Sequence, residues 1–88
     1  MTISLDSHCS LSSQVALRPE PFGALAYHYG NRRLVFLKHP DVVAVVKNLA
    51  DHPTVRATFD ACGIAAERHG AFLAALDNLS KSEIIHVG

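Results

Sequence analysis

Two short apolar runs joined by Gly30-Asn31 constrain the fold more than any other feature of the chain. The runs cover residues 24–29 and 32–37, and a two-residue Gly-Asn connection favours the primed turn of a β-hairpin. Such a turn fixes the register of the two strands. The predicted pairs are Leu25–Phe36 and Tyr27–Leu34 on one face, and Ala24–Leu37 and Ala26–Val35 on the other. Both faces carry apolar groups, so a hairpin alone would leave apolar surface in water.

The segment before the hairpin is expected to add one short strand. Val15 and Leu17 flank Ala16, and Pro19 should end this strand because proline cannot donate a hydrogen bond to a β-ladder. Residues 1–13 are polar, Ser-rich and aperiodic, which predicts a flexible N-terminal tail without an assigned function. Residues 14–88 are then expected to form a single domain, because 88 residues cannot supply a second core.

Three helices are expected after the hairpin, and they supply the cover that its apolar surface needs. Pro40 favours the start of the first helix, which should end near residue 50, and a shorter second helix follows Pro53 and stops at Gly63. The third helix is expected over residues 67–80, with an apolar stripe made of Phe72, Leu73, Leu76 and Leu79. Residues 83–87 can form only a brief extended tail. The predicted fold class is α+β and winged-helix-like, a three-stranded antiparallel sheet followed by three helices.

Composition and charge exclude several partners. The chain is 49% hydrophobic with eight basic and eight acidic side chains, so no net field attracts nucleic acid or an anionic membrane. The chain shows neither a secretory signal pattern nor an apolar run of membrane-spanning length. We therefore expect a cytoplasmic protein that binds no membrane and no nucleic acid.

The residues that could carry chemistry do not form a catalytic or metal-binding pattern. The six histidines lack any spacing typical of a metal site, so no metal is expected. Cys62 belongs to the apolar stripe of the second helix and Cys9 to the expected tail, and neither has the setting of a nucleophile. No nucleotide-binding or hydrolase motif occurs, so the chain is not expected to be an enzyme.

A small winged-helix DNA-binding regulator is the alternative from another functional class. In such regulators the recognition helix is rich in basic and amide side chains and a hairpin wing follows it. Here the third helix contains Glu67 and Asp77 with few basic residues, and the hairpin precedes the helices. These features count against DNA binding.

The edge of the sheet is the most informative candidate site. If the strands form a meander, residues 33–37 lie outermost, with backbone N–H and C=O groups that a guest peptide could pair with as an added strand. Arg32, Arg33 and Lys38 surround this edge and would steer an acidic guest toward it. A free edge also allows pairing with a second copy of the chain, so a homodimer through this edge stays open.

The stretch of residues 15–38, VALRPEPFGALAYHYGNRRLVFLK, closely resembles a known family. Its segments LRPEPFGAL, YHYG and RRLVFLK are similar to the peptide chaperones of mycofactocin biosynthesis (MftB), which belong to the PqqD-like group of precursor-peptide recognition elements. The similar stretch covers about a quarter of the chain, and beyond it the similarity is looser.

This resemblance implies a function and a site. It implies a winged-helix-like domain that binds the leader of the mycofactocin precursor peptide and presents it to a radical S-adenosylmethionine (SAM) maturase. In the group, the guest lies as an added strand between the third strand and the third helix. On this sequence the implied peptide-binding residues are Arg33, Leu34, Val35, Phe36 and Leu37 on one wall, and Phe72, Leu73, Leu76 and Leu79 on the other. The iron-sulfur cluster and S-adenosylmethionine belong to the partner enzyme, so no cofactor is expected here.

Overall fold

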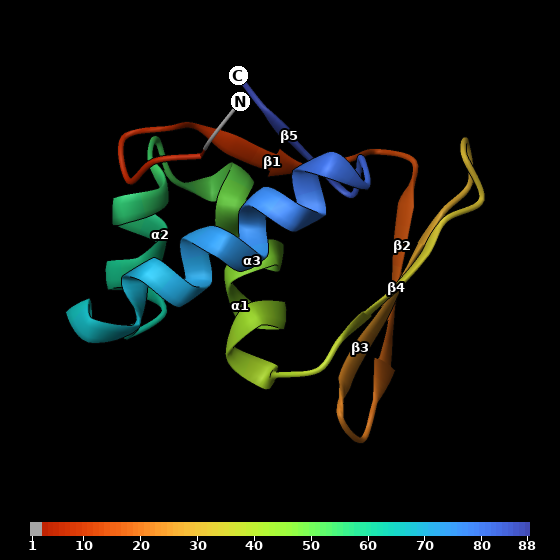
Figure 1. The fold of residues 1–88 in the computed structure, drawn as a ribbon, viewed down its shortest axis with the longest axis horizontal. Helices are drawn as coiled ribbons and strands as arrows, with labels where there is room; N and C mark the ends of the chain where they lie inside the picture. Colours follow the sequence, from red (N-terminus) through yellow and green to blue (C-terminus); the bar gives the residue numbers. More distant parts are fainter. Residues whose placement is uncertain (1–2) are drawn as a thin grey trace.

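The central sheet is a meander of three consecutive strands. The computed structural model describes residues 3–88, in which β2 (Val15–Glu20), β3 (Gly23–His28) and β4 (Leu34–Leu37) pair antiparallel in the order β2-β3-β4 (Figure 1). The β3–β4 register confirms the expected partners, which are Ala24–Leu37, Leu25–Phe36, Ala26–Val35 and Tyr27–Leu34. Consequently β2 and β4 form the two edges of this sheet.

The β3–β4 hairpin closes through a longer loop than expected. The N–H of His28 donates to the carbonyl of Arg33 at 2.9 Å, and the carbonyl of His28 accepts from the N–H of Arg32 at 2.8 Å. These bonds leave residues 29–32 as a four-residue loop. The prediction of a two-residue Gly30-Asn31 turn is therefore wrong, although the register is right. The buried His28 ring explains the difference, since its Nδ1 accepts the N–H groups of Gly30 and Asn31 at 3.0 and 3.1 Å.

Strand β2 also runs further than expected. It continues through Pro19 to Glu20 rather than ending at Pro19. Because β2 is an edge strand, the missing proline N–H need not break the ladder to β3.

The helices follow the sheet in the predicted order. They are α1 (Pro40–Asn48), continued by the 3-10 turn η1 (Leu49–Asp51), then α2 (Val55–Ala61), the 3-10 turn η2 (Ala66–Arg68) and α3 (His69–Lys81). The side chains of His39 and Thr54 cap α1 and α2, and Gly63 ends the α2 region at φ +71°, as its position predicts. All three α-helices lie on one side of the three-stranded sheet (Figure 1). The observed fold is thus a three-stranded antiparallel sheet with three helices, as the fold class predicted.

A second, two-stranded sheet was not expected. Strand β1 (Cys9–Leu11) pairs antiparallel with β5 (Ile85–Val87), and the two lie side by side at the top of Figure 1. Ile3 and Cys9 are also buried in the core. Residues 3–13 are therefore not the flexible tail that was expected. Apolar side chains in this Ser-rich segment are buried against residues distant in sequence. Residues 1–2 of that expected tail lie outside the described residues.

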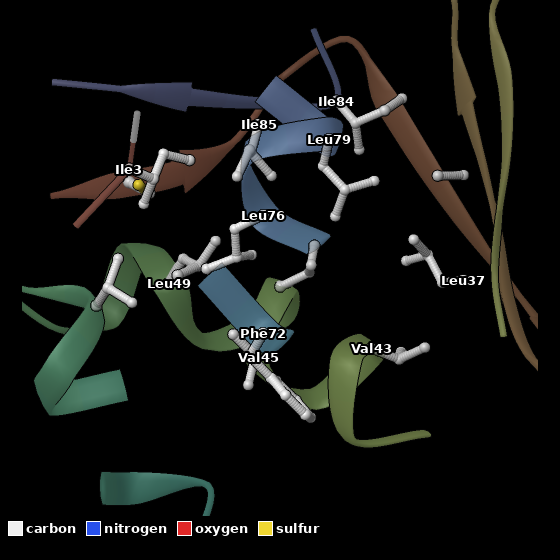
Figure 2. Close-up of a cluster of buried hydrophobic side chains, with 14 of the residues drawn as sticks. Ile3, Leu37, Val43, Val45, Leu49, Phe72, Leu76, Leu79, Ile84 and Ile85 are labelled. Carbon is white, nitrogen blue, oxygen red and sulfur yellow. The ribbon is translucent and has the colours of Figure 1, made fainter. Parts of the chain in front are cut away.

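The core lies between the sheet and the helices. Figure 2 shows Phe72 and Leu76 of α3 directed toward Val45 and Leu49, and Leu37 entering from the sheet. The inner face of the sheet is closed by small residues, since Ala24 and Ala26 are buried beneath the helices. Within residues 3–88 no helix has the length and apolarity needed to cross a membrane.

Candidate functional site

The β4 edge of the central sheet carries backbone groups without a partner strand among the described residues, and it borders a groove. Within residues 3–88, β4 pairs with β3 alone, so its other side forms an open edge. Bonded and non-bonded pairs alternate along an antiparallel ladder. Because His28 and Arg33 form a hydrogen-bonded pair, the backbone groups of Val35 and Leu37, two and four residues further along, also point toward β3. The N–H and C=O groups of Leu34 and Phe36 therefore point outward. In agreement, a Cβ added at Gly23 on β3 would overlap the Leu37 carbonyl oxygen.

Side chains of β4 alternate between two surroundings. Leu37 is buried on the helix side and Val35 is half-buried there, whereas Leu34 and Phe36 are 52% and 55% exposed on the opposite, outer face. Arg33, just before β4, is exposed as well. A strand laid along this edge would therefore meet apolar side chains on both of its faces.

An apolar groove runs beside β4 on the helix side. We call this cavity of about 480 Å³ the inner groove, and it lies between β4, the start of α1 and the second half of α3. Its lining residues are Val35, Phe36, Leu37, Lys38, His39, Val42, Ala75, Asn78 and Leu79. The strand wall thus contains three of the five β4-side residues predicted from the resemblance, which are Val35, Phe36 and Leu37. The other two, Arg33 and Leu34, lie at the same edge outside the lining.

The helix wall differs from the one predicted. Of Phe72, Leu73, Leu76 and Leu79, the inner groove is lined by Leu79 alone. Phe72 and Leu76 are buried in the core, and Leu73 is half-buried against it (Figure 2). Phe72 and Leu76 thus pack in the core, and Leu79 is the predicted helix residue that borders the inner groove.

Sequence reasoning missed the residues that give the groove its space. Ala75 and Asn78 of α3 line it together with Val42 of α1, and none of the three was predicted. The available signal was side-chain size, since a helix that borders an open groove carries small or polar residues on the flank of its apolar stripe. Ala75 and Asn78 lie on that flank, one and two positions from Leu76.

The three basic residues near the edge are free of ion pairs within the described chain. Arg32, Arg33 and Lys38 are exposed, and none forms a salt bridge with any residue of 3–88. Of the nearby acidic side chains, Asp41 pairs with Arg68 at 2.9 Å, and Glu83 accepts a hydrogen bond from the Asn31 amide. The open edge thus presents positive charge without an internal counter-charge.

Comparison with known proteins identifies the family. The family model "Peptide chaperone MftB family" matches residues 8–86. A peptide chaperone MftB from Mycolicibacterium smegmatis is 47% identical over 88 residues, which is 100% of this chain and 86% of the relative. Another, from Mycobacterium ulcerans, is 51% identical over 75 residues, which is 85% of this chain and 69% of the relative. A third, from Mycobacterium tuberculosis, is 45% identical over 75 residues, with the same coverage as the second. No solved structure gives a significant match.

The chain belongs to the peptide chaperone MftB family. The residues matched by the family model include β1 and the first two residues of β5, so the match reaches into the second sheet. The relatives are named as chaperones of peptides, which describes accessory binding proteins and not catalysts.

In this MftB-family chain both ends of the inner groove are tied. At one end, the side-chain amide of Asn31 in the hairpin loop donates to Glu83 Oε2 at 3.0 Å, just beyond α3. At the other, residues 38 and 39 lead from β4 directly into α1. The hairpin loop thus contacts the chain just beyond α3, and β4 is connected directly to α1.

The cysteines of this MftB-family chain are poorly suited to nucleophilic chemistry. Burial raises the pKa of the Cys9 thiol, and burial together with the nearby Asp41 carboxylate raises the pKa of Cys62. A raised pKa leaves less of the reactive thiolate at neutral pH. In residues 3–88, no group of three or more His, Cys, Asp or Glu side chains converges as metal ligands would.

Proposed function

We propose that this chain binds the leader of the mycofactocin precursor peptide by strand addition at β4 and presents the peptide to a radical SAM maturase. The observation that carries the proposal is the open edge of β4, whose outward N–H and C=O groups at Leu34 and Phe36 lie directly beside the inner groove. Family membership supports a peptide as the ligand. The maturase and its cofactors would be separate from this chain.

Backbone pairing and groove filling supply complementary parts of the affinity. A guest strand would form about four hydrogen bonds with the outward groups, each worth roughly 0.5–1.5 kcal/mol net. This interaction is independent of guest sequence, because it uses the backbone alone. Selectivity then comes from the inner groove, where Val42, Ala75 and Leu79 offer an apolar surface to every second guest side chain.

Charge selects among apolar peptides. The unpaired Arg32, Arg33 and Lys38 favour a guest with acidic side chains near the segment that pairs with β4. When the leader is held in this way, the distant C-terminal end of the precursor peptide stays free. Presentation to a second enzyme requires such a free end. The proposed cargo is thus an acidic, partly apolar leader that becomes extended when bound.

Paired substitutions at one position test strand addition. Leu34→Pro removes an outward N–H, whereas Leu34→Ala removes the side chain and keeps that N–H. We expect at least about tenfold weaker binding of the fluorescein-labelled precursor peptide by the proline variant than by the alanine variant, because guest hydrogen bonds are lost. Fluorescence anisotropy gives the affinities, and circular dichroism checks that both variants fold. Equal affinities in two folded variants would exclude backbone pairing at this edge.

The DNA-binding alternative is tested in the same assay. A labelled duplex DNA is titrated beside the precursor peptide at two salt concentrations, since contacts to phosphates give a steep salt dependence. We expect binding of the peptide and none of the duplex. Tight, strongly salt-dependent binding of the duplex with no binding of the peptide would replace the chaperone proposal with the regulator.

A further inference from the structure

A second hollow lies on the opposite side of the same strand. We call this cavity of about 380 Å³ the outer hollow, and its lining residues are Phe22, Phe36 and Lys38. Phe22 comes from the β2–β3 turn and its ring packs edge-on against Phe36, with 5.8 Å between the ring centroids. Phe22 and Phe36 remain 39% and 55% exposed, because no helix within residues 3–88 covers this face (Figure 1). Two adjacent exposed phenylalanine rings beside a hollow offer an apolar contact surface to a partner.

The outer hollow and the inner groove meet at the open edge. Phe36 and Lys38 line both cavities, one on each side of β4. The backbone groups of Phe36 point outward between them. Since consecutive side chains of a strand point to opposite faces, a guest strand along β4 would direct one set of side chains into the inner groove and the alternate set toward the outer hollow.

We propose that the outer hollow is a second side-chain site for the bound peptide, which takes a bulky apolar side chain of the guest against Phe22 and Phe36, with a guest carboxylate beside Lys38. The inference rests on the proposed function and deepens it. The peptide is then recognised on both faces, so its binding segment has apolar side chains at odd and even positions, with acidic residues near the end that meets Lys38.

Charge argues against a second copy of the chain as the occupant. When two β4 strands pair antiparallel about an axis through Val35, the outward groups of Leu34 and Phe36 face each other and Arg32 of one copy lies opposite Lys38 of the other. Like charges placed directly opposite each other are destabilising. The same cations attract a carboxylate, and neither Arg32 nor Lys38 has an ion-pair partner within residues 3–88.

The test asks which guest positions each cavity contacts. Phe22→Ala empties the outer hollow from a turn position outside the β-ladder, and Ala75→Leu fills the inner groove from α3. Each variant is titrated against a set of labelled precursor peptides with single alanine substitutions. We expect Phe22→Ala to weaken binding of the unsubstituted peptide about tenfold. When the peptide already carries alanine at a position that faces the outer hollow, Phe22→Ala should cause no further loss of affinity. Ala75→Leu should show the same lack of further loss at the alternate guest positions, which face the inner groove.

Two failures can be told apart. Unchanged affinity of a folded Phe22→Ala variant, with binding still lost in Ala75→Leu and Leu34→Pro, would overturn the outer site and leave strand addition standing. Absence of peptide binding in the unmodified chain would overturn the proposed function itself. Sedimentation of the unmodified chain as a dimer that the peptide does not dissociate would assign the edge to a second copy and overturn both proposals.

Discussion

The position of each residue along β4 determines what that residue can do. Val35 and Leu37 bond to β3 and turn their side chains toward the helices, whereas Leu34 and Phe36 direct backbone groups to the open edge and side chains to the outer face. We therefore expect a substitution at the first pair to disturb the fold, and one at the second pair to disturb the proposed binding. The two roles alternate residue by residue within a strand of four residues.

Ala75 is the residue whose size is best placed to control the inner groove. It lines the groove and is half-buried, while Ala74 beside it is exposed and is not part of the lining. We expect Ala75→Leu to reduce affinity for the precursor peptide by at least about tenfold, since three added carbon atoms occupy space meant for guest side chains. Anisotropy titration measures this effect.

Ala74→Leu is the matched control, with the same change of volume one position away. It should leave the affinity within about twofold, because a single exposed substitution on a helix rarely changes more. If both variants bind as tightly as the unmodified chain, the guest does not enter the groove.

Among the elements, β1 and β5 were the least predictable from sequence. The central hairpin and its register followed from alternation and from a turn signal that is local. In contrast, β1 and β5 are three residues each and pair across almost the full length of the chain, so no local period announces them. Ile3 and Cys9 lie in a Ser-rich segment, and only the tertiary structure determines that these two side chains are buried.

The lining of the inner groove differs from the helix wall predicted from sequence for a related reason. Periodicity finds the apolar stripe of α3, but a stripe such as Phe72 and Leu76 serves the core first. The groove is lined by the smaller residues beside it, Ala75 and Asn78. Sequence patterns locate what a helix buries better than what it leaves open.

The small β1–β5 sheet should stabilise the domain. Ser10→Pro introduces a proline in the middle of β1, opposite His86, where it disrupts the ladder and forces the chain away from β5. We expect a loss of roughly 1–3 kcal/mol in the free energy of unfolding. Urea denaturation followed by circular dichroism measures this loss.

Ser13→Pro serves as the comparison, because Ser13 is exposed and lies between β1 and β2. It should cost less than Ser10→Pro. Equal stability of the Ser10→Pro variant and the unmodified chain would indicate that residues 3–11 are held only loosely in solution, as the sequence alone suggested.

Considered as a whole, the molecule is electrically neutral but has an uncompensated basic edge. Its eight basic and eight acidic side chains balance, yet Arg32, Arg33 and Lys38, which form no ion pair within residues 3–88, gather at one edge. Long-range attraction of this kind acts mainly on the rate of encounter and weakens as salt screens it.

We therefore expect association with the acidic precursor peptide to slow as the salt concentration rises, with little change in dissociation. Arg33→Glu should slow association at low salt by about tenfold. Stopped-flow fluorescence separates the two rates, and Arg56→Glu, at an exposed arginine paired with Asp6 outside the site, is the control for net charge. Equal slowing in both charge variants would show that net charge matters and that the edge does not.

Sharing of Phe36 and Lys38 by the two cavities limits how such a chaperone can change its cargo. An altered Phe36 would shift the preferences of both faces together and would most often yield a chain that accepts neither the old leader nor a new one. Phe22 and Ala75 each belong to a single cavity, so they can be retuned independently. We therefore expect adaptation to a new precursor, in nature or by engineering, to be easiest through Phe22 and Ala75 while Phe36 stays the same.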